Sequence, residues 1–367
     1  MKLAFFAMPQ HPLEKKYHQT LAEDREMTLI ADRLGFHEGF FGEHITDAAE
    51  AITSSLIFIA WLLAETKSIT LGTGTINMAN HHPVRVASEV AMVDNMAKGR
   101  FIMGISPGGL ASDAEVLETI DKDRQKMFLE AIDTVLAIWE RDPPYNIKGE
   151  FWNVSTERTI FMEVGQGQMN RPYQRPHPPI VVTAVAPFSK GVTEAAARGW
   201  DPISANFLLP QWVKTHWPSY CTGCERVGRP ADPKNWRVAK SIFVADDLDT
   251  ARRYATEKGG PYYDYFEPFL KKLIKHGRSN LFKADQSAPD SSLSPEKCVD
   301  DAVIWGTPDK VTEELLAFRE EVGDFGTLLY CSHDWVDPAL AKRSMELMAE
   351  QVIPAVNHHS ASSSEVA

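Results

Sequence analysis

Residues 69–105 read ITLGTGTINMANHHPVRVASEVAMVDNMAKGRFIMGI, and this stretch decides the fold. The apolar run at 69–74 predicts a strand, and the run at 101–105 predicts another. Between them a proline opens the helical pattern of 83–97, as proline often does at the first position of a helix. A strand, a helix and a second strand in succession are the repeating unit of a parallel sheet.

The same unit recurs along the whole chain. We predict eight strands, over residues 3–8, 38–42, 69–74, 101–105, 179–183, 201–205, 236–245 and 327–331. Eight strands, each followed by a helix and without a break in composition, predict a (β/α)8 TIM barrel of the α/β class. A doubly wound sheet is the alternative, but the glycine fingerprint that such sheets carry is missing after the first predicted strand.

The barrel is expected to form a single domain over residues 1–357, with insertions. Residues 141–178 and 262–297 show no clear periodicity, and we expect two irregular excursions there. Residues 358–367 are rich in serine and alanine and have no apolar pattern, so we expect a disordered tail.

Composition excludes several classes of protein. The chain has 367 residues and a formal net charge of -12, which is unsuited to nucleic acid. The most apolar stretch, 52–64, is too short to span a membrane, and the first residues lack a signal-peptide cleavage site, so we expect a cytoplasmic protein. Four cysteines are too few for a disulfide framework, and the isolated pair Cys221 and Cys224 lacks further metal ligands.

Polar residues that follow the predicted strands are the first candidates for a site, because TIM-barrel active sites lie at the carboxyl ends of the strands. Glu43 and His44 follow the second strand, and Asn77 and His81 follow the third. Ser106 follows the fourth. A metal could be bound by Glu43, His44, His81 and His82, but the sequence has no HxH or HExxH pattern, so we expect none.

The segment after the fifth strand suggests a phosphate site. Ala186, Phe188, Ser189 and Lys190 lie where a helix begins, and the first turn of a helix presents free N–H groups to an anion. Ser189 and Lys190 add two donors. The alternative is that Ser189 only caps its helix. The residues alone therefore indicate a barrel enzyme with a phosphorylated ligand.

An ordered series of motifs gives the chain a family resemblance. The matching stretches cover residues 35–44, 69–75, 82–85, 94–104, 124–130, 179–190 and 306–308, nearly the whole length of the chain. In these stretches the chain resembles the bacterial-luciferase-like flavin monooxygenases, and most closely their limonene and diketocamphane monooxygenase branch. The resemblance implies a luciferase-like TIM barrel.

The resemblance also implies an activity. A separate NAD(P)H-dependent flavin reductase would deliver reduced FMN (FMNH2), and the enzyme would use O2 to oxidise a small apolar, terpenoid-like molecule by Baeyer–Villiger insertion or hydroxylation. A homodimer is expected, formed by the helices after the second and third strands. Two alternatives stay open, namely a deazaflavin-dependent oxidoreductase and a non-catalytic flavin-binding protein.

The resemblance assigns roles to single residues. His44 would handle protons or stabilise the oxygenated flavin. The Gly74–Thr75 bond matches a non-proline cis peptide beneath the flavin ring, and Ser106 stands where luciferase has a reactive cysteine, which argues against light emission. Arg124 matches a phosphate-binding arginine. The expected FMN-binding residues are Gly74, Thr75, Asn77, Ser106, Arg124, Ala186, Phe188, Ser189 and Lys190; the expected substrate wall is His81, Phe151, Trp152, Phe161, Met162 and Trp335.

Overall fold

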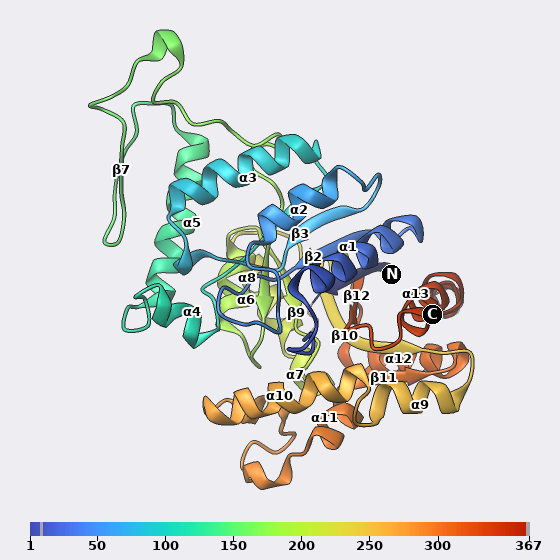
Figure 1. Ribbon diagram of the computed structural model, residues 1–367. Coiled ribbons are helices and arrows are strands. Elements are labelled where there is room, and N and C mark those ends of the chain that lie inside the picture. The colour runs from blue at the N-terminus through green and yellow to red at the C-terminus, as the bar shows by residue number, and fades with distance from the viewer. Residues whose placement is uncertain (8–9, 365–367) are drawn as a thin grey trace. The chain divides into compact units, whose positions relative to one another are not determined.

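The computed structural model describes residues 1–7 and 10–364 and has the predicted TIM-barrel fold (Figure 1). The barrel strands are β1 (Lys2–Ala7), β2 (Glu38–Phe41), β3 (Thr70–Thr73), β5 (Phe101–Ser106), β8 (Ile180–Ala184), β9 (Asp201–Ser204), β10 (Arg237–Val244) and β12 (Thr327–Ser332). They follow one another in this order, and β12 pairs again with β1 in parallel register from Lys2 opposite Thr327. This closure confirms the barrel.

All eight predicted strands are present, and no end differs from the prediction by more than one residue; Met8, the last residue of the first predicted strand, lies outside the described residues. Four short strands occur in the described residues besides the eight barrel strands. β4 (Ile76–Asn77) pairs with β5, and β11 (Val303–Gly306) pairs with β10. β6 (Asn146–Lys148) and β7 (Asn153–Ser155) form a separate antiparallel hairpin.

The helices lie between the strands in the expected alternation. They are α1 (Tyr17–Arg33), α2 (Ser55–Leu63), α3 (Pro83–Ala97), α4 (Ala111–Val116), α5 (Arg124–Glu140), α6 (Lys190–Ala197), α7 (Pro210–Val213), α8 (His216–Arg226), α9 (Leu248–Thr256), α10 (Pro261–Lys275), α11 (Pro295–Ala302), α12 (Pro308–Val322), α13 (Pro338–Leu347) and α14 (Ile353–Ser364), with short 3-10 turns such as η1 (Met78–Asn80) and η2 (Met162–Val164). Within the described residues, none of them has the length and apolar character that crossing a membrane requires.

Two compact units make up the chain. Unit 1 comprises Met1–Gly39 and Val182–Ala367, and unit 2 comprises Phe40–Val181, so the division falls within β2 and β8. The organisation as one domain over residues 1–357 stays a prediction.

Glycines in two barrel strands make room for phenylalanine rings. In unit 1, a Cβ at Gly39 would lie 2.4 Å from Cε1 of Phe5, and in unit 2 a Cβ at Gly72 would lie 2.4 Å from Cε1 of Phe40. Both distances are far below van der Waals contact, so any larger residue would displace a ring. Both phenylalanines are fully buried, and the glycine–phenylalanine pairs therefore fix the packing of neighbouring strands.

The excursions are less irregular than the sequence predicts. The second one contains α10 and α11, so the expectation of irregular structure is wrong there. Pro268 lies inside α10 and obscured its pattern, because proline usually ends a helix. The first excursion contains the hairpin β6–β7. Helix α14 also continues through residues 358–364 of the expected disordered tail, and residues 365–367 lie outside the described residues.

Candidate functional site

Glu43 follows β2 and ties together three segments of unit 2. Its Oε1 accepts hydrogen bonds from the backbone N–H of Asn77 (3.0 Å) and from Nε2 of His81 (2.7 Å). Its Oε2 accepts two from Ser55, at 3.2 Å from the backbone N–H and 2.8 Å from Oγ. Burial alone would raise the pKa of the Glu43 carboxyl, but the bonds from His81, Asn77 and Ser55 hold it below the ordinary value. Glu43 is therefore a buried carboxylate.

Ser106, at the end of β5, is the centre of a second group of hydrogen bonds. Its Oγ donates to Oδ1 of Asn77 (3.1 Å) and accepts from Oγ1 of Thr75 (2.7 Å) and the N–H of Gly108 (3.1 Å). Nδ2 of Asn77 in turn donates to the backbone oxygen of Glu43 (2.9 Å). The predicted residues Thr75, Asn77 and Ser106 thus lie together in unit 2. The peptide bond between Gly74 and Thr75 is cis, as predicted.

Arg124 opens α5 and holds the turn after β5. One guanidinium nitrogen donates to Oδ1 of Asn80 (3.0 Å) and to the backbone oxygen of Pro107 (2.8 Å), and the other donates to Oγ1 of Thr119 (2.5 Å). Gly108 has a φ of 84°, and a Cβ there would lie 2.6 Å from the guanidinium. Arg124 is therefore a fixed, half-buried cation in unit 2, and not the solvated residue that its place at a helix start would allow.

His44 lies between two carboxylates of unit 2. Its Nδ1 is 3.2 Å from Oδ2 of Asp113 in α4, and its Nε2 is 3.3 Å from Oε2 of Glu50. Asp113 also accepts from the N–H groups of Ile45 and Thr46. Burial works against the charged imidazole, but the bond to Asp113 and the charge of Glu50 outweigh it and raise the pKa of His44. The bonds from His44 and Thr46 lower the pKa of Asp113 to about 2 in spite of its burial.

Unit 1 holds the expected phosphate loop, residues 186–190. Nε2 of His216 is 2.9 Å from the backbone oxygen of Ala186, and Nδ1 is 2.8 Å from Oγ of Ser204. A carbonyl only accepts, so His216 carries its proton on Nε2, and Nδ1 accepts from Ser204. Burial lowers the pKa of His216 to about 4, which keeps the ring neutral. A buried neutral histidine therefore fixes the first residue of the loop.

The remaining loop residues include the N-cap of α6 and one exposed lysine. Ser189 is the N-cap of α6, and its Oγ accepts from the N–H of Val192 (3.3 Å), as the simple capping interpretation expects. Phe188 is 71% exposed, and its N–H donates to Oγ1 of Thr215 (2.8 Å). Lys190 is exposed at the helix start. The loop thus presents the N-terminus of α6 and the charged side chain of Lys190, and phosphate binding there stays a prediction.

Four residues of the expected substrate wall belong to the first excursion of unit 2. Phe151 and Trp152 lie in the turn of the hairpin, where their N–H groups donate to the Glu130 carboxylate at 2.9 and 2.8 Å. Phe161 and Met162 are each about half exposed. Figure 1 shows the hairpin labelled β7 extending away from α3 and α5. The structure does not bring these four residues together with His44 or His81 in any described contact.

Trp335 lies in unit 1, just after β12. It is buried, and its backbone N–H donates to Oε1 of Glu23 in α1 (2.7 Å). The ammonium of Lys342 in α13 lies 5.3 Å from the centroid of its ring. These contacts place it against the helical layer. His81, the last predicted wall residue, is bonded to Glu43 in unit 2.

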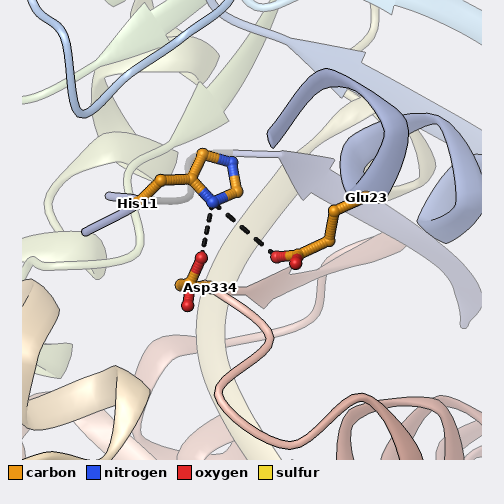
Figure 2. Close-up of side chains that lie close together, drawn as sticks. All are labelled: His11, Glu23 and Asp334. Carbon is orange, nitrogen blue, oxygen red and sulfur yellow. Dashed lines mark hydrogen bonds and ion pairs between the residues drawn. The ribbon is translucent and has the colours of Figure 1, made fainter. Parts of the chain in front are cut away.

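A buried charge cluster joins the ends of β1 and β12 in unit 1 (Figure 2). Nδ1 of His11 lies 2.6 Å from Oδ1 of Asp334 and 3.7 Å from Oε1 of Glu23, and the three could ligate a metal. However, the ammonium of Lys15 bonds both Glu23 and Asp334. A cation therefore already bridges the two carboxylates, and the cluster is an ion-pair network.

Sequence reasoning missed the partners of the predicted residues. Asp113 is 69 positions from His44, and His216 is 30 positions from Ala186, so no local spacing reveals either pair. Glu43 is a candidate from sequence only as a strand-end residue and a possible metal ligand, and its contacts with Asn77, His81 and Ser55 were not predicted. A strand-end carboxylate followed by two serines at the start of a helix, here Ser54 and Ser55, is the signal that could have indicated a buried hub.

The closed parallel barrel, with polar groups at the carboxyl ends of its strands, defines a TIM-barrel enzyme. The family described as luciferase-like monooxygenase matches residues 1–324. The chain belongs to this family and is a monooxygenase, which confirms the predicted family.

Curated relatives are similar to the chain over almost its full length. It is 29% identical to 4-hydroxyprotoasukamycin monooxygenase of Streptomyces nodosus subsp. asukaensis, over 96% of this chain and 91% of that one. It is 27% identical to limonene 1,2-monooxygenase of Rhodococcus erythropolis (96% and 86%). It is 26% identical to the oxygenase component of the flavin-dependent trigonelline monooxygenase of Acinetobacter baylyi (97% and 95%).

A solved structure shares the fold. The chain superimposes with a TM-score of 0.87 on the oxygenating constituent of 3,6-diketocamphane monooxygenase from Pseudomonas putida, a type II Baeyer–Villiger monooxygenase in complex with FMN. The two are 25% identical, and the match covers 97% of this chain and 98% of the other. The limonene and diketocamphane branch that the sequence resembles is thus among its relatives.

Proposed function

We propose that the chain is an FMNH2-dependent, two-component monooxygenase that uses O2 to oxidise a small apolar, terpenoid-like molecule by Baeyer–Villiger insertion or hydroxylation. The observation that carries the proposal is the cluster in unit 2, where His44, Thr75 and Ser106 lie at or near the ends of strands and Arg124, at the start of α5, bonds the turn after β5. The FMN complex of the diketocamphane enzyme and the names of the limonene and trigonelline relatives support it.

The donor groups fit a phosphorylated flavin. Unit 2 offers the guanidinium of Arg124, and unit 1 offers the N-terminus of α6 with Lys190, and both kinds of donor suit a phosphate. We extend the proposal to the remaining expected FMN ligands, Ala186 and Phe188 by their backbone and Ser189 by its hydroxyl. Reduced flavin, when bound, supplies the two electrons with which one oxygen atom enters the substrate and the other leaves as water.

His44 has the surroundings of a proton donor. Both ring nitrogens face carboxylates, which accept and never donate when ionised, so the ring holds a proton on each nitrogen. The raised pKa of His44 favours this charged form. We propose that His44 holds a proton beside the reacting oxygen, and that Asp113 fixes the orientation of the ring.

The partners of the protein follow from the same proposal. The trigonelline relative is the oxygenase component of its system, which supports a separate NAD(P)H-dependent flavin reductase as the source of FMNH2 here.

A homodimer is supported by an exposed apolar face on α2 and α3, where Ile57, Trp61, Met92 and Met96 repeat at helical spacing. We place the reaction in the cytoplasm, where reduced nicotinamide is available.

Oxygen incorporation tests the proposed function. The purified chain, a flavin reductase, NADH and FMN are incubated with cyclic ketones and alkenes under isotopically labelled O2. We expect one labelled oxygen atom in the product and none without the chain. Reduction of the same substrates by reduced deazaflavin under nitrogen would contradict the proposal and favour the deazaflavin-dependent class, and a stable flavin complex without product would favour the binding protein.

A further inference from the structure

The Glu43 carboxylate is placed to control two residues of the proposed site together. It bonds the backbone of Asn77 and the ring of His81, while its own backbone oxygen accepts from the Asn77 side chain. Asn77 thereby has both amide atoms engaged inside the protein, since its Oδ1 accepts from Ser106. Asn77 is a supporting residue, and His81 keeps bonding capacity for a ligand.

His81 retains one ring nitrogen that the protein does not use. Nε2 bonds Glu43, and no partner for Nδ1 occurs among the residues that the structure describes. The side chain is 32% exposed, whereas that of Glu43 is buried. A carboxylate cannot donate, so Nε2 carries a proton in this pair.

We propose that Glu43 is a positioning residue, which holds His81 as an imidazolium so that its second ring N–H is offered to an acceptor oxygen bearing negative charge on the bound ligands. The inference rests on the proposed function and adds the partner of His81. Reduced flavin and a carbonyl substrate both present such an oxygen, and the experiment separates them.

The charges around His81 support this role. Glu43, after β2, and Glu89, in α3, are the charged groups that face it. Burial works against the charged ring, but the bond to Glu43 and the two negative charges outweigh it and raise the pKa of His81. A charged N–H donor forms a stronger hydrogen bond than a neutral one. Burying such a donor without an acceptor costs free energy.

The test compares Glu43→Gln with three controls. Glutamine keeps the size and can still accept from Asn77, but it removes the charge that protonates His81. Ser55→Ala is the matched control, because it removes a hydrogen bond to the same carboxylate without touching His81. Glu43→Asp keeps the charge, and His81→Gln replaces the imidazolium by a neutral side chain that cannot titrate.

The first readout is the titration of His81, followed by NMR in protein with labelled histidine and without flavin. We expect the pKa of His81 to fall in Glu43→Gln and to remain raised in Ser55→Ala. An unchanged titration in Glu43→Gln would overturn the proposal, whatever the enzyme does. This readout needs no activity, so it is separate from a failure of the proposed function.

The second readout locates the acceptor. Anaerobic titration gives the affinity for FMNH2, and steady-state kinetics give KM for the substrate, for each variant relative to wild type. We compare the variants at a pH between the His81 pKa of Glu43→Gln and that of wild type, both known from the first readout. A loss of FMNH2 affinity of about tenfold at that pH, recovering near pH ~5.5 where His81 protonates without help, assigns the acceptor to the flavin. The same pattern in KM assigns it to the substrate.

The pattern of loss distinguishes positioning from simple structure. In His81→Gln we expect the loss at every pH, and in the double variant no further loss, because the two residues act as one unit. An equal loss at all pH values in Glu43→Gln, or full additivity, would overturn the proposal. Wild-type behaviour in Glu43→Asp is the expected rescue.

Discussion

At the scale of single residues, the site consists of paired groups whose chemistry depends on a distant partner. His44 pairs with Asp113, and His81 pairs with Glu43. In each pair a buried carboxylate accepts from an imidazole, and the protonated ring is favoured. The functional properties of these histidines are therefore set by residues that only the fold brings near.

His44→Ala tests the proton donor. We expect FMN binding to stay within about threefold of wild type and oxygenation to slow by at least roughly tenfold, because a positioned general acid contributes that much or more. Fluorescence titration and oxygen uptake measure the two effects. Asp113→Asn is the companion variant, since it keeps the loop bonds of Thr46 and removes the charge. Wild-type turnover in His44→Ala would remove His44 from the mechanism.

His11→Gln tests the ion-pair cluster. Burial opposes the charged ring, but the bonds to Asp24 and Asp334 outweigh it and raise the pKa of His11 from 6.5 to about 9. A raised histidine pKa stabilises the fold fully below pH 6.5, and this contribution disappears as the pH rises through 9.

Urea unfolding at about pH 6 and about pH 9.5 measures this contribution. Wild type should exceed His11→Gln in free energy of unfolding by about 3 kcal/mol more at the lower pH, from the size of the pKa shift. A difference that does not change with pH would mean that His11 is neutral in the folded protein.

At the scale of elements, the sequence predicted the barrel well because each strand and helix has its own periodicity. All eight barrel strands were found, but α10 was not, since Pro268 interrupts its pattern. The cap of α2 was likewise ambiguous. Ser54 caps the helix by accepting from the N–H of Ile57, but Thr53 beside it is an equally good capping residue, and sequence does not distinguish the two.

The site was predicted in outline for a related reason. The strand-end rule found His44, Asn77, His81 and Ser106, because position in a barrel strand follows from periodicity. Asp113 and His216 lie on later helices and reach their partners only in three dimensions. The substrate wall at Phe161 and Met162 stays a prediction, because an apolar residue type does not show where an excursion folds.

His216→Leu tests how α8 supports the loop of residues 186–190. The variant leaves the oxygens of Ala186 and Ser204 without their buried partner, and we expect a loss of about 2–3 kcal/mol in stability. We also expect FMN affinity to fall by roughly tenfold, because a loosened loop presents its donors less well. Calorimetry and fluorescence titration measure these effects. Unchanged affinity in a destabilised variant would separate this loop from FMN binding.

At the scale of the whole molecule, the apolar face on α2 and α3 gives the proposal of a homodimer its physical content. Met92→Glu places a charge within the exposed group formed with Ile57, Trp61 and Met96. Burying an unpaired charge in an interface is strongly unfavourable, so we expect a shift from dimer to monomer in analytical ultracentrifugation. Lys148→Glu, on the hairpin β6–β7, is the control. A wild-type protein that sediments as a monomer would contradict the homodimer.

The central claim is that this barrel binds reduced FMN and protects its reaction with O2. The most direct measurement is to saturate the purified protein with FMNH2 under nitrogen, mix it rapidly with O2 and follow the absorbance of oxidised FMN. We expect oxidised FMN to return much more slowly than from free FMNH2, and added substrate to be oxidised in a single turnover. Oxidation as fast as that of free FMNH2, at saturating protein, would contradict it.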